Sequence, residues 1–404
     1  MDEYRRERRL RSRCLFFAPE QSSPTGRRSK LFLFAGLFAA TFAVLTAVSR
    51  IPVPLYAYAP GEAASVEPFV RMGTEQEQEQ DQDQDQGQEH RGASIRMLTV
   101  KLSELTVAGA LREWLDPVAE VRTKRQVFGE ETVREYGGRM LVLMKGAQHD
   151  AIRAAYRQLG IPFGERILGV YVQEVQPGSP WREHILPGDR LVAVDGKPVE
   201  DLASLESAWT EGSAGAGGIP EPRTKRRIEL ERFTEGVRTN LVAEAELPPG
   251  DDGRKWQASG LVATELRELA ADDPALQIRI DVKEVGGPSA GLPFALEAYA
   301  RLGGTLGETS PDDVIAATGT IDERGAVCPV GGIPQKLEAA ALAGAKLVLV
   351  PADRPAGSCG LSFATANGTE ARELANKRHE GMEVRPVATF EEAIAAVREW
   401  NSLR

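Results

Sequence analysis

The sequence predicts a mixed α/β protein in which a membrane-spanning helix precedes the folded domains. Residues 31–49 carry no charge and are long enough, as a helix, to cross a bilayer. From residue 167 the apolar residues follow the two-residue period of β-strands, whereas residues 292–299 and 334–344 follow helical spacing. With 404 residues and 42% hydrophobic content, the chain is expected to form two or three domains.

The N-terminal segment predicts the topology of the chain. In residues 1–30, a basic tail, nine lysines and arginines outnumber four acidic residues. A cationic flank before an apolar helix keeps the N-terminus in the cytoplasm, so everything after residue 50 is expected outside. A cleavable signal peptide with a small-x-small site at Ala57-Tyr58-Ala59 is the alternative. We favour an uncleaved single-pass anchor in the cell membrane, because the apolar core exceeds a usual signal-peptide core.

Charge and cysteine content exclude two classes of partner. A net charge of -10 and a pI near 5.3 argue against nucleic acid. The three cysteines form no Cys-x-x-Cys and no Cys/His cluster, so no metal site is expected.

Residues 50–160 are expected to form an extracytoplasmic α/β region. Strands are predicted at residues 66–72 and 94–101 and paired with each other, and helices near residues 108–115 and 140–159. Between the two strands, residues 74–92 alternate Glu or Asp with Gln and cannot bury a core, which predicts disorder.

Residues 164–247 combine strand periodicity with a strong hairpin signal, Asp195-Gly196, and a helix beginning at Leu202. This pattern resembles a PDZ domain, which binds extended peptides as an added strand at a sheet edge. The resemblance implies that the carboxylate loop and the binding edge are Leu168, Gly169, Val170 and Tyr171. The alternative is a small β-domain that only spaces the last domain from the membrane. Residues 248–256 are the expected linker to a domain at 257–404.

Three motifs in the last domain each present a side chain suited to acyl transfer. They are Gly-Gly-Pro-Ser-Ala-Gly at 286–291, Ala-Thr-Gly-Thr at 317–320 and Gly-Gly-Ile-Pro-Gln-Lys at 331–336. Ser289 is expected at a helix N-terminus, where the dipole stabilises an oxyanion. Lys336 is expected in the first turn of a helix beginning at Pro334, where burial and the dipole both lower its pKa. A neutral lysine can accept the serine proton, so a Ser/Lys dyad is coherent.

In this order the motifs resemble the proteolytic domain of Lon-type serine proteases, over roughly residues 260–397. The resemblance implies Ser289 as nucleophile, Lys336 as general base and Thr318 as the hydroxyl that orients the lysine. One departure is Gly286, where cytosolic Lon enzymes often carry Asp.

The whole arrangement is similar to membrane-anchored PDZ–Lon proteases of Gram-positive bacteria, which process secreted peptides or exposed protein segments. No Gly-x-x-x-x-Gly-Lys-Ser/Thr occurs in the sequence, so neither a nucleotide nor another cofactor is expected. Lon-type domains often form rings, which implies a homo-oligomer, although no residue pattern indicates an interface. The expected protein is an ATP-independent serine endopeptidase with an extracellular catalytic domain.

Two other functions remain open. An α/β-hydrolase esterase would use Ser289, Asp353 and His379 in that chain order. A non-enzymatic adaptor would capture peptides through the PDZ-like domain alone.

Cys328 and Cys359 either form a disulfide or are two separate buried thiols, and we expect the separate thiols.

Overall fold

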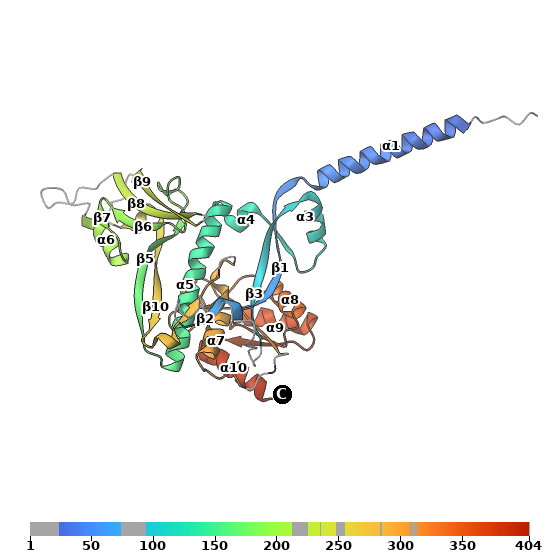
Figure 1. Ribbon diagram of the computed structural model, residues 1–404. Coiled ribbons are helices and arrows are strands. Elements are labelled where there is room, and N and C mark those ends of the chain that lie inside the picture. Colours follow the sequence, from blue (N-terminus) through green and yellow to red (C-terminus); the bar gives the residue numbers. More distant parts are fainter. Residues whose placement is uncertain are drawn as a thin grey trace, which may run out of the picture.

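A computed structural model describes residues 24–73, 94–211, 225–234, 236–247, 255–282, 285–307, 310 and 313–403. The predicted insertion at 74–92, most of the basic tail and most of the linker therefore lie outside the described residues. The described part is a mixed α/β structure, as predicted (Figure 1).

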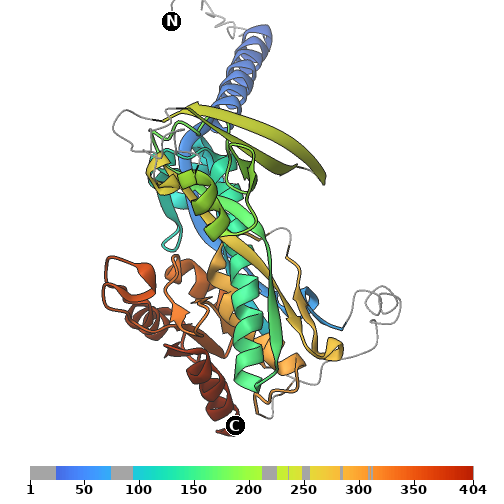
Figure 2. The same ribbon diagram turned by 90° about the vertical axis from the view of Figure 1, so that its left-hand side faces the viewer.

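The chain begins with a long helix that projects away from the rest of the protein. Helix α1 (Pro24–Ser49) starts before the apolar stretch and contains it. The window Phe32–Ser49 is long and apolar enough to cross a membrane, and none of it is buried within the protein. Figures 1 and 2 both show α1 standing clear of the domains. A membrane-spanning helix and a signal sequence can both form a long, apolar helix of this kind.

One six-stranded sheet joins the two ends of the chain, in the order β16-β15-β12-β3-β1-β4. Strands β3, β12, β15 and β16 run parallel, whereas β1 is antiparallel to β3 and β4 to β1. The bounds are β1 (Pro52–Ser65), β3 (Ser94–Thr106), β4 (Glu120–Thr123), β12 (Val314–Ala317), β15 (Leu347–Pro351) and β16 (Glu383–Val387). The N-terminal strands thus complete the sheet of the C-terminal domain.

Helices cover both faces of this sheet. Residues alternate along β15, with Leu347 and Leu349 packing on one side and Val348 and Val350 on the other. The first face meets α5 (Val133–Leu159), α7 (Gly291–Arg301) and α10 (Phe390–Ser402), and the second meets α8 (Ile333–Leu342) and α9 (Asn367–Arg378). This three-layer arrangement is typical of parallel sheets buried on both sides.

The predicted strand at residues 66–72 and its partner are corrected. Its first half is a 3-10 turn (Glu67–Phe69), and only β2 (Val70–Met72) is a strand. β2 pairs with β11 (Ile278–Ile280), not with β3. β3 instead lies between β1 and β12. Pro68 explains the turn, because proline lacks the N–H that a strand ladder requires.

A second sheet has the order β10-β5-β6-β8-β9, with β7 paired to β6. Its strands are β5 (Phe163–Val175), β6 (Arg190–Val194), β7 (Lys197–Pro198), β8 (Lys225–Thr234), β9 (Val237–Glu246) and β10 (Leu261–Ala271). The Asp195-Gly196 hairpin is confirmed, since both residues have positive φ and join β6 to β7. Helix α6 (Leu202–Glu211) follows, and its Trp209 joins Trp181 and Trp256 in the core.

The predicted peptide-binding edge is wrong. Leu168, Gly169, Val170 and Tyr171 lie on β5, which is an interior strand of the second sheet. β10 pairs with one side of this stretch and β6 with the other. The prediction failed because β10 comes from beyond the linker, outside the stretch in which the pattern was recognised. Among the described strands, β10 and β9 are the edges of this sheet.

Helix α5 joins the two sheets. It packs against α7 on one side and against β5 and β10 on the other (Figure 1). Arg153 on α5 bonds Glu165 of β5 at 2.8 Å and is itself buried. A Cβ on Gly138 would lie 2.3 Å from the carbonyl oxygen of Pro187, so this close approach requires glycine.

The remaining elements are short. α3 (Val107–Trp114) follows β3, and α4 (Lys124–Phe128) follows β4. β13 (Thr320–Ile321) and β14 (Val327–Cys328) form a small hairpin beside α7.

Candidate active site

Ser289 lies in the turn that starts α7, the most buried helix of the C-terminal domain. It is the middle residue of a 3-10 turn (Pro288–Ala290), and α7 begins at the next residue. Nine residues of α7, Gly291 to Tyr299, are buried. The predicted position at a helix N-terminus is therefore confirmed, and the positive end of the α7 dipole lies where it can stabilise negative charge beside Ser289.

Thr318 joins this turn to the sheet. It follows β12, is fully buried, and its Oγ1 donates to the carbonyl oxygen of Ser289 at 3.3 Å. The next residue reinforces the contact, since Gly319 N donates to the same oxygen at 2.9 Å. Leu292 N, in the first turn of α7, donates back to Gly319 O at 3.0 Å. The Thr-Gly motif thus holds the serine turn from two sides.

The side chain of Lys336, which lies on α8, extends to Thr318. Helix α8 begins at Ile333, one residue before the predicted start, with Pro334 in its first turn. The Nζ of Lys336 donates to Thr318 Oγ1 at 2.9 Å, and the side chain is buried. Burial lowers the pKa of Lys336 to about 7, because the charged ammonium is deprived of water. Near neutral pH a large fraction of this lysine is a neutral base.

Glycines allow the three motifs to approach one another. Gly332 caps α8 with φ of 72°, and a Cβ there would lie 2.8 Å from Val100 Cγ2. Gly287 has φ of 93°, and its N–H donates to Met140 O on α5 at 2.9 Å. A Cβ on Gly286 would meet Met140 Cβ at 2.9 Å. The close approach of α5 therefore leaves no room for an aspartate at Gly286.

A cavity of about 1230 Å³ opens over Ser289 and Lys336. Its apolar wall comes from α5, where Met140, Leu141 and Met144 line it. The opposite wall belongs to β1, β3 and β4 and carries charged side chains, including Glu62 and Lys101. Both walls come from residues before 160, so the last domain alone does not form the site.

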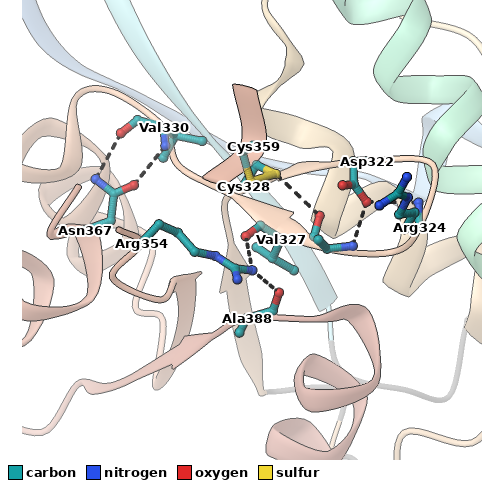
Figure 3. The surroundings of a disulfide bond; sticks show 10 residues. Asp322, Arg324, Val327, Cys328, Val330, Arg354, Cys359, Asn367 and Ala388 are labelled. Carbon is teal, nitrogen blue, oxygen red and sulfur yellow. Dashed lines mark hydrogen bonds between the residues drawn. A yellow bond between two sulfur atoms is a disulfide. The ribbon is translucent and has the colours of Figure 1, made fainter. Parts of the chain in front are cut away.

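The segment that leads into α8 is fixed by partners that the sequence did not reveal (Figure 3). Asn367 holds Val330 with two hydrogen bonds, accepting from its N–H at 2.8 Å and donating to its carbonyl at 3.1 Å. Cys328 and Cys359 form a disulfide, so the expectation of separate thiols is wrong. That expectation failed because the loop carrying Cys359 has no periodicity from which its position could be inferred.

The esterase triad is not assembled. His379 follows α9, where its Nε2 lies 3.4 Å from Glu338 Oε2. Asp353 instead accepts hydrogen bonds from the backbone and side chain of Thr369. Neither His379 nor Asp353 lines the cavity that contains Ser289. The geometry therefore contradicts the hydrolase alternative.

Two family models match separate parts of the chain. Residues 277–397 match the Lon protease (S16) C-terminal proteolytic domain, and residues 157–216 match the PDZ domain. These matches confirm the resemblances inferred from the motifs. The segment 50–156, which supplies both cavity walls, lies in neither match.

Among curated proteins, a Lon protease of Methylocella silvestris is 46% identical over 272 residues, or 61% of this chain and 32% of its own. An archaeal Lon protease of Methanothermobacter thermautotrophicus is 43% identical over 130 residues, or 29% of this chain and 20% of its own. Lon protease 2 of Bacillus subtilis is 29% identical over 202 residues, 49% of this chain and 30% of its own. The chain thus spans a third or less of the length of these relatives.

Proposed function

We propose, from the premise that residues 277–397 are a Lon-type proteolytic domain, that this protein is an ATP-independent serine endopeptidase with a Ser289/Lys336 dyad. The observation that carries the proposal is the state of Lys336. Its Nζ is buried, lines the cavity that contains Ser289, and has the neutral hydroxyl of Thr318 as its hydrogen-bond partner. With a pKa of about 7, it is a base at the pH of most extracellular fluids.

The hydrogen bonds at Thr318 support a specific arrangement of protons in the proposed dyad. Thr318 Oγ1 donates its hydrogen to Ser289 O, so it acts as an acceptor toward Lys336. A neutral lysine has two N–H bonds and one lone pair, and Thr318 takes up one N–H. The lone pair is left for the proton of Ser289 Oγ once substrate is bound.

The reaction then follows the usual course of acyl transfer. Ser289 Oγ attacks the scissile carbonyl carbon while its proton passes to Lys336 Nζ. The developing oxyanion is stabilised by the positive end of the α7 dipole, beside the Ser289 turn. Lys336 returns the proton to the leaving amine, leaving an ester on Ser289. Water, deprotonated by Lys336, hydrolyses this ester and restores the dyad.

The substrate class follows from the shape of the site. The cavity accommodates an extended segment between an apolar and a charged wall, so peptides and locally unfolded protein segments fit better than folded domains. The apolar wall, which includes Met140 and Met144, favours apolar side chains beside the scissile bond.

Recruitment by the PDZ domain is assigned to β10 instead of β5. β10 is an edge strand that lies beside α6, because Glu265 Oε1 accepts a hydrogen bond from Leu202 N at 2.9 Å. A peptide added along β10 would extend the sheet next to α6. We expect an extended peptide to slow amide hydrogen exchange at residues 261–266 in a Ser289→Ala protein. Slowed exchange at β9 alone would assign recruitment to the other edge.

The proposed location is the cell membrane, with α1 as a single span, the N-terminus in the cytoplasm and the catalytic domain outside. The exposed apolar surface of Phe32–Ser49 and the basic residues before it support this arrangement. A homo-oligomer stays a prediction from the resemblance.

Labelling with a fluorophosphonate probe tests the function. The wild-type protein is expected to be labelled and to cleave an unstructured peptide, Ser289→Ala to lose both activities, and Ser402→Ala, on the exposed end of α10, to retain both. Labelling that persists in Ser289→Ala would refute the nucleophile. No labelling of the folded wild-type protein would favour the adaptor.

A further inference from the structure

Helix α3 is turned with its apolar residues outward. Leu111, Trp114 and Leu115 are 60%, 78% and 80% exposed and lie three and four residues apart, so they share one side of the helix. The buried residue of α3 is instead Glu113, which pairs with Arg112 at 2.6 Å. A helix on the surface of a soluble domain normally shows the reverse arrangement. We call Leu111, Trp114 and Leu115 the α3 patch.

The α3 patch adjoins the candidate membrane span. Val107 N, at the start of α3, donates to Ile51 O just beyond the end of α1, at 3.1 Å. The two helices contact each other, and Figure 1 shows α3 at the base of α1. Ile51 is itself half exposed, and the window Phe32–Ser49 is entirely unburied. The apolar surface of α1 therefore continues onto α3.

We propose that the α3 patch inserts into the surface of the bilayer that α1 spans. This inference rests on the proposed membrane anchoring. A helix adjoining the end of a span lies at the level of the lipid headgroups, where tryptophan is enriched and leucine reaches the acyl chains. Burial of Leu111, Trp114 and Leu115 there removes the exposure that a soluble domain would avoid.

The second attachment orients the active site. β1 and β3 run from the α1–α3 junction into the C-terminal domain (Figure 1). Residues of both strands line the cavity over Ser289. A single helical anchor would let the domain tilt freely. With α1 and α3 both in the membrane, the cavity is held at a fixed distance and direction from the lipid, which suits peptides whose cleavage site lies near a membrane.

Tryptophan fluorescence can test this directly, because the chain carries its own probe. Of the five tryptophans, Trp114 is exposed and Trp181, Trp209, Trp256 and Trp400 are 0–6% exposed. The full chain is reconstituted in vesicles of phosphatidylcholine and phosphatidylglycerol, with or without bromine near the top of the acyl chains. We expect brominated lipid to quench part of the emission, Trp114→Phe to lose this quenchable part, and Leu111→Asn with Leu115→Asn to weaken it.

The outcomes separate this inference from the proposals on which it rests. Emission unaffected by brominated lipid, in a protein that resists carbonate extraction, would refute insertion of α3 while leaving the α1 anchor intact. Protein that washes off the vesicles would refute both. A blue shift of Trp114 that depends on protein concentration in detergent would assign the patch to a second copy of the chain. Peptide cleavage should be unchanged in Trp114→Phe, since Trp114 does not line the cavity.

Discussion

Arg226 in the PDZ region and Lys336 in the proteolytic region are both buried basic side chains, but their surroundings differ. In the PDZ region, Arg226 is fully buried but bonded to Asp195 Oδ2 at 2.7 Å and to the carbonyl oxygen of Trp209 at 2.8 Å. Its guanidinium also lies over the Trp209 ring. In the proteolytic region, Lys336 is equally buried but bonds a neutral hydroxyl. Arg226 therefore supports the fold through its partners, whereas Lys336, whose pKa is lowered by burial to about 7, becomes a base.

Replacing the buried lysine should give the largest effect. Lys336→Met removes the base at nearly constant volume, and turnover of an unstructured peptide is expected to fall roughly 10³-fold or more. The matched control is Lys346→Met, which removes a half-exposed lysine paired with Asp313. Turnover near the wild-type level in Lys336→Met would show that Lys336 is not the catalytic base.

Replacing the buried arginine should instead affect stability. Arg226→Met leaves the Asp195 carboxylate without its guanidinium, and the free energy of unfolding is expected to fall by about 3–5 kcal/mol. Arg227→Met, at an exposed neighbour, should cost less than about 1 kcal/mol. Urea unfolding of both variants measures the difference. Equal losses would mean that the pair around Arg226 is not structural.

The pH dependence of stability should also differ between variants of Lys336 and Arg226. The folded pKa of Lys336 is about 7, and an unfolded lysine titrates near 10.4. Between these values the unfolded chain binds one more proton, so stability should rise with pH by about 1.4 kcal/mol per unit. This rise should be absent in Lys336→Met and present in Arg226→Met. A fall in stability over this range would contradict a depressed pKa.

The activity should also depend on the protonation state of Lys336. The neutral lysine is the active form, so kcat/KM is expected to rise about tenfold per pH unit up to pH 7 and then level off. The limb should persist in His379→Ala. Its disappearance there would assign the base to the histidine.

The smallest effect is expected at Thr318. Thr318→Val removes the hydroxyl that holds Lys336 at nearly constant shape, and kcat is expected to fall about tenfold with little change in KM. The pH limb should also move, because the lysine loses its hydrogen-bond partner. A tenfold loss with an unchanged limb would mean that Thr318 supports the Ser289 turn and not the base.

The site residues that lie in the three motifs could be predicted from the sequence, whereas those that other segments contribute could not. Ser289, Thr318 and Lys336 lie in motifs that start or end an element, so glycines, a proline and helical spacing place them within a few residues. Met140 and Asn367 are ordinary residues in their own segments, and they become part of the site only through contacts across the fold. No local pattern signals such contacts.

The fold shows the same division. Helices α3 and α6 and the Asp195-Gly196 hairpin follow from periodicity and turn residues. The errors concern which strands pair, as with β2 and β11 or β5 and β10. Pairing depends on which strands meet when the chain collapses. The alternation of apolar and polar residues does not distinguish an edge strand from an interior strand.

The position of β3 has a consequence for how the protein is made. It pairs in parallel with β12, so Ser94 lies beside Val314, 220 positions later in the sequence. The centre of the sheet cannot close until the C-terminal strands have emerged, and contacts this distant in sequence slow folding. Until then β1 and β3 expose one unpaired edge, which is prone to wrong pairing. Helix α8, which carries Lys336 and packs against β1 and β3, can likewise reach the cavity wall only after these later residues have emerged.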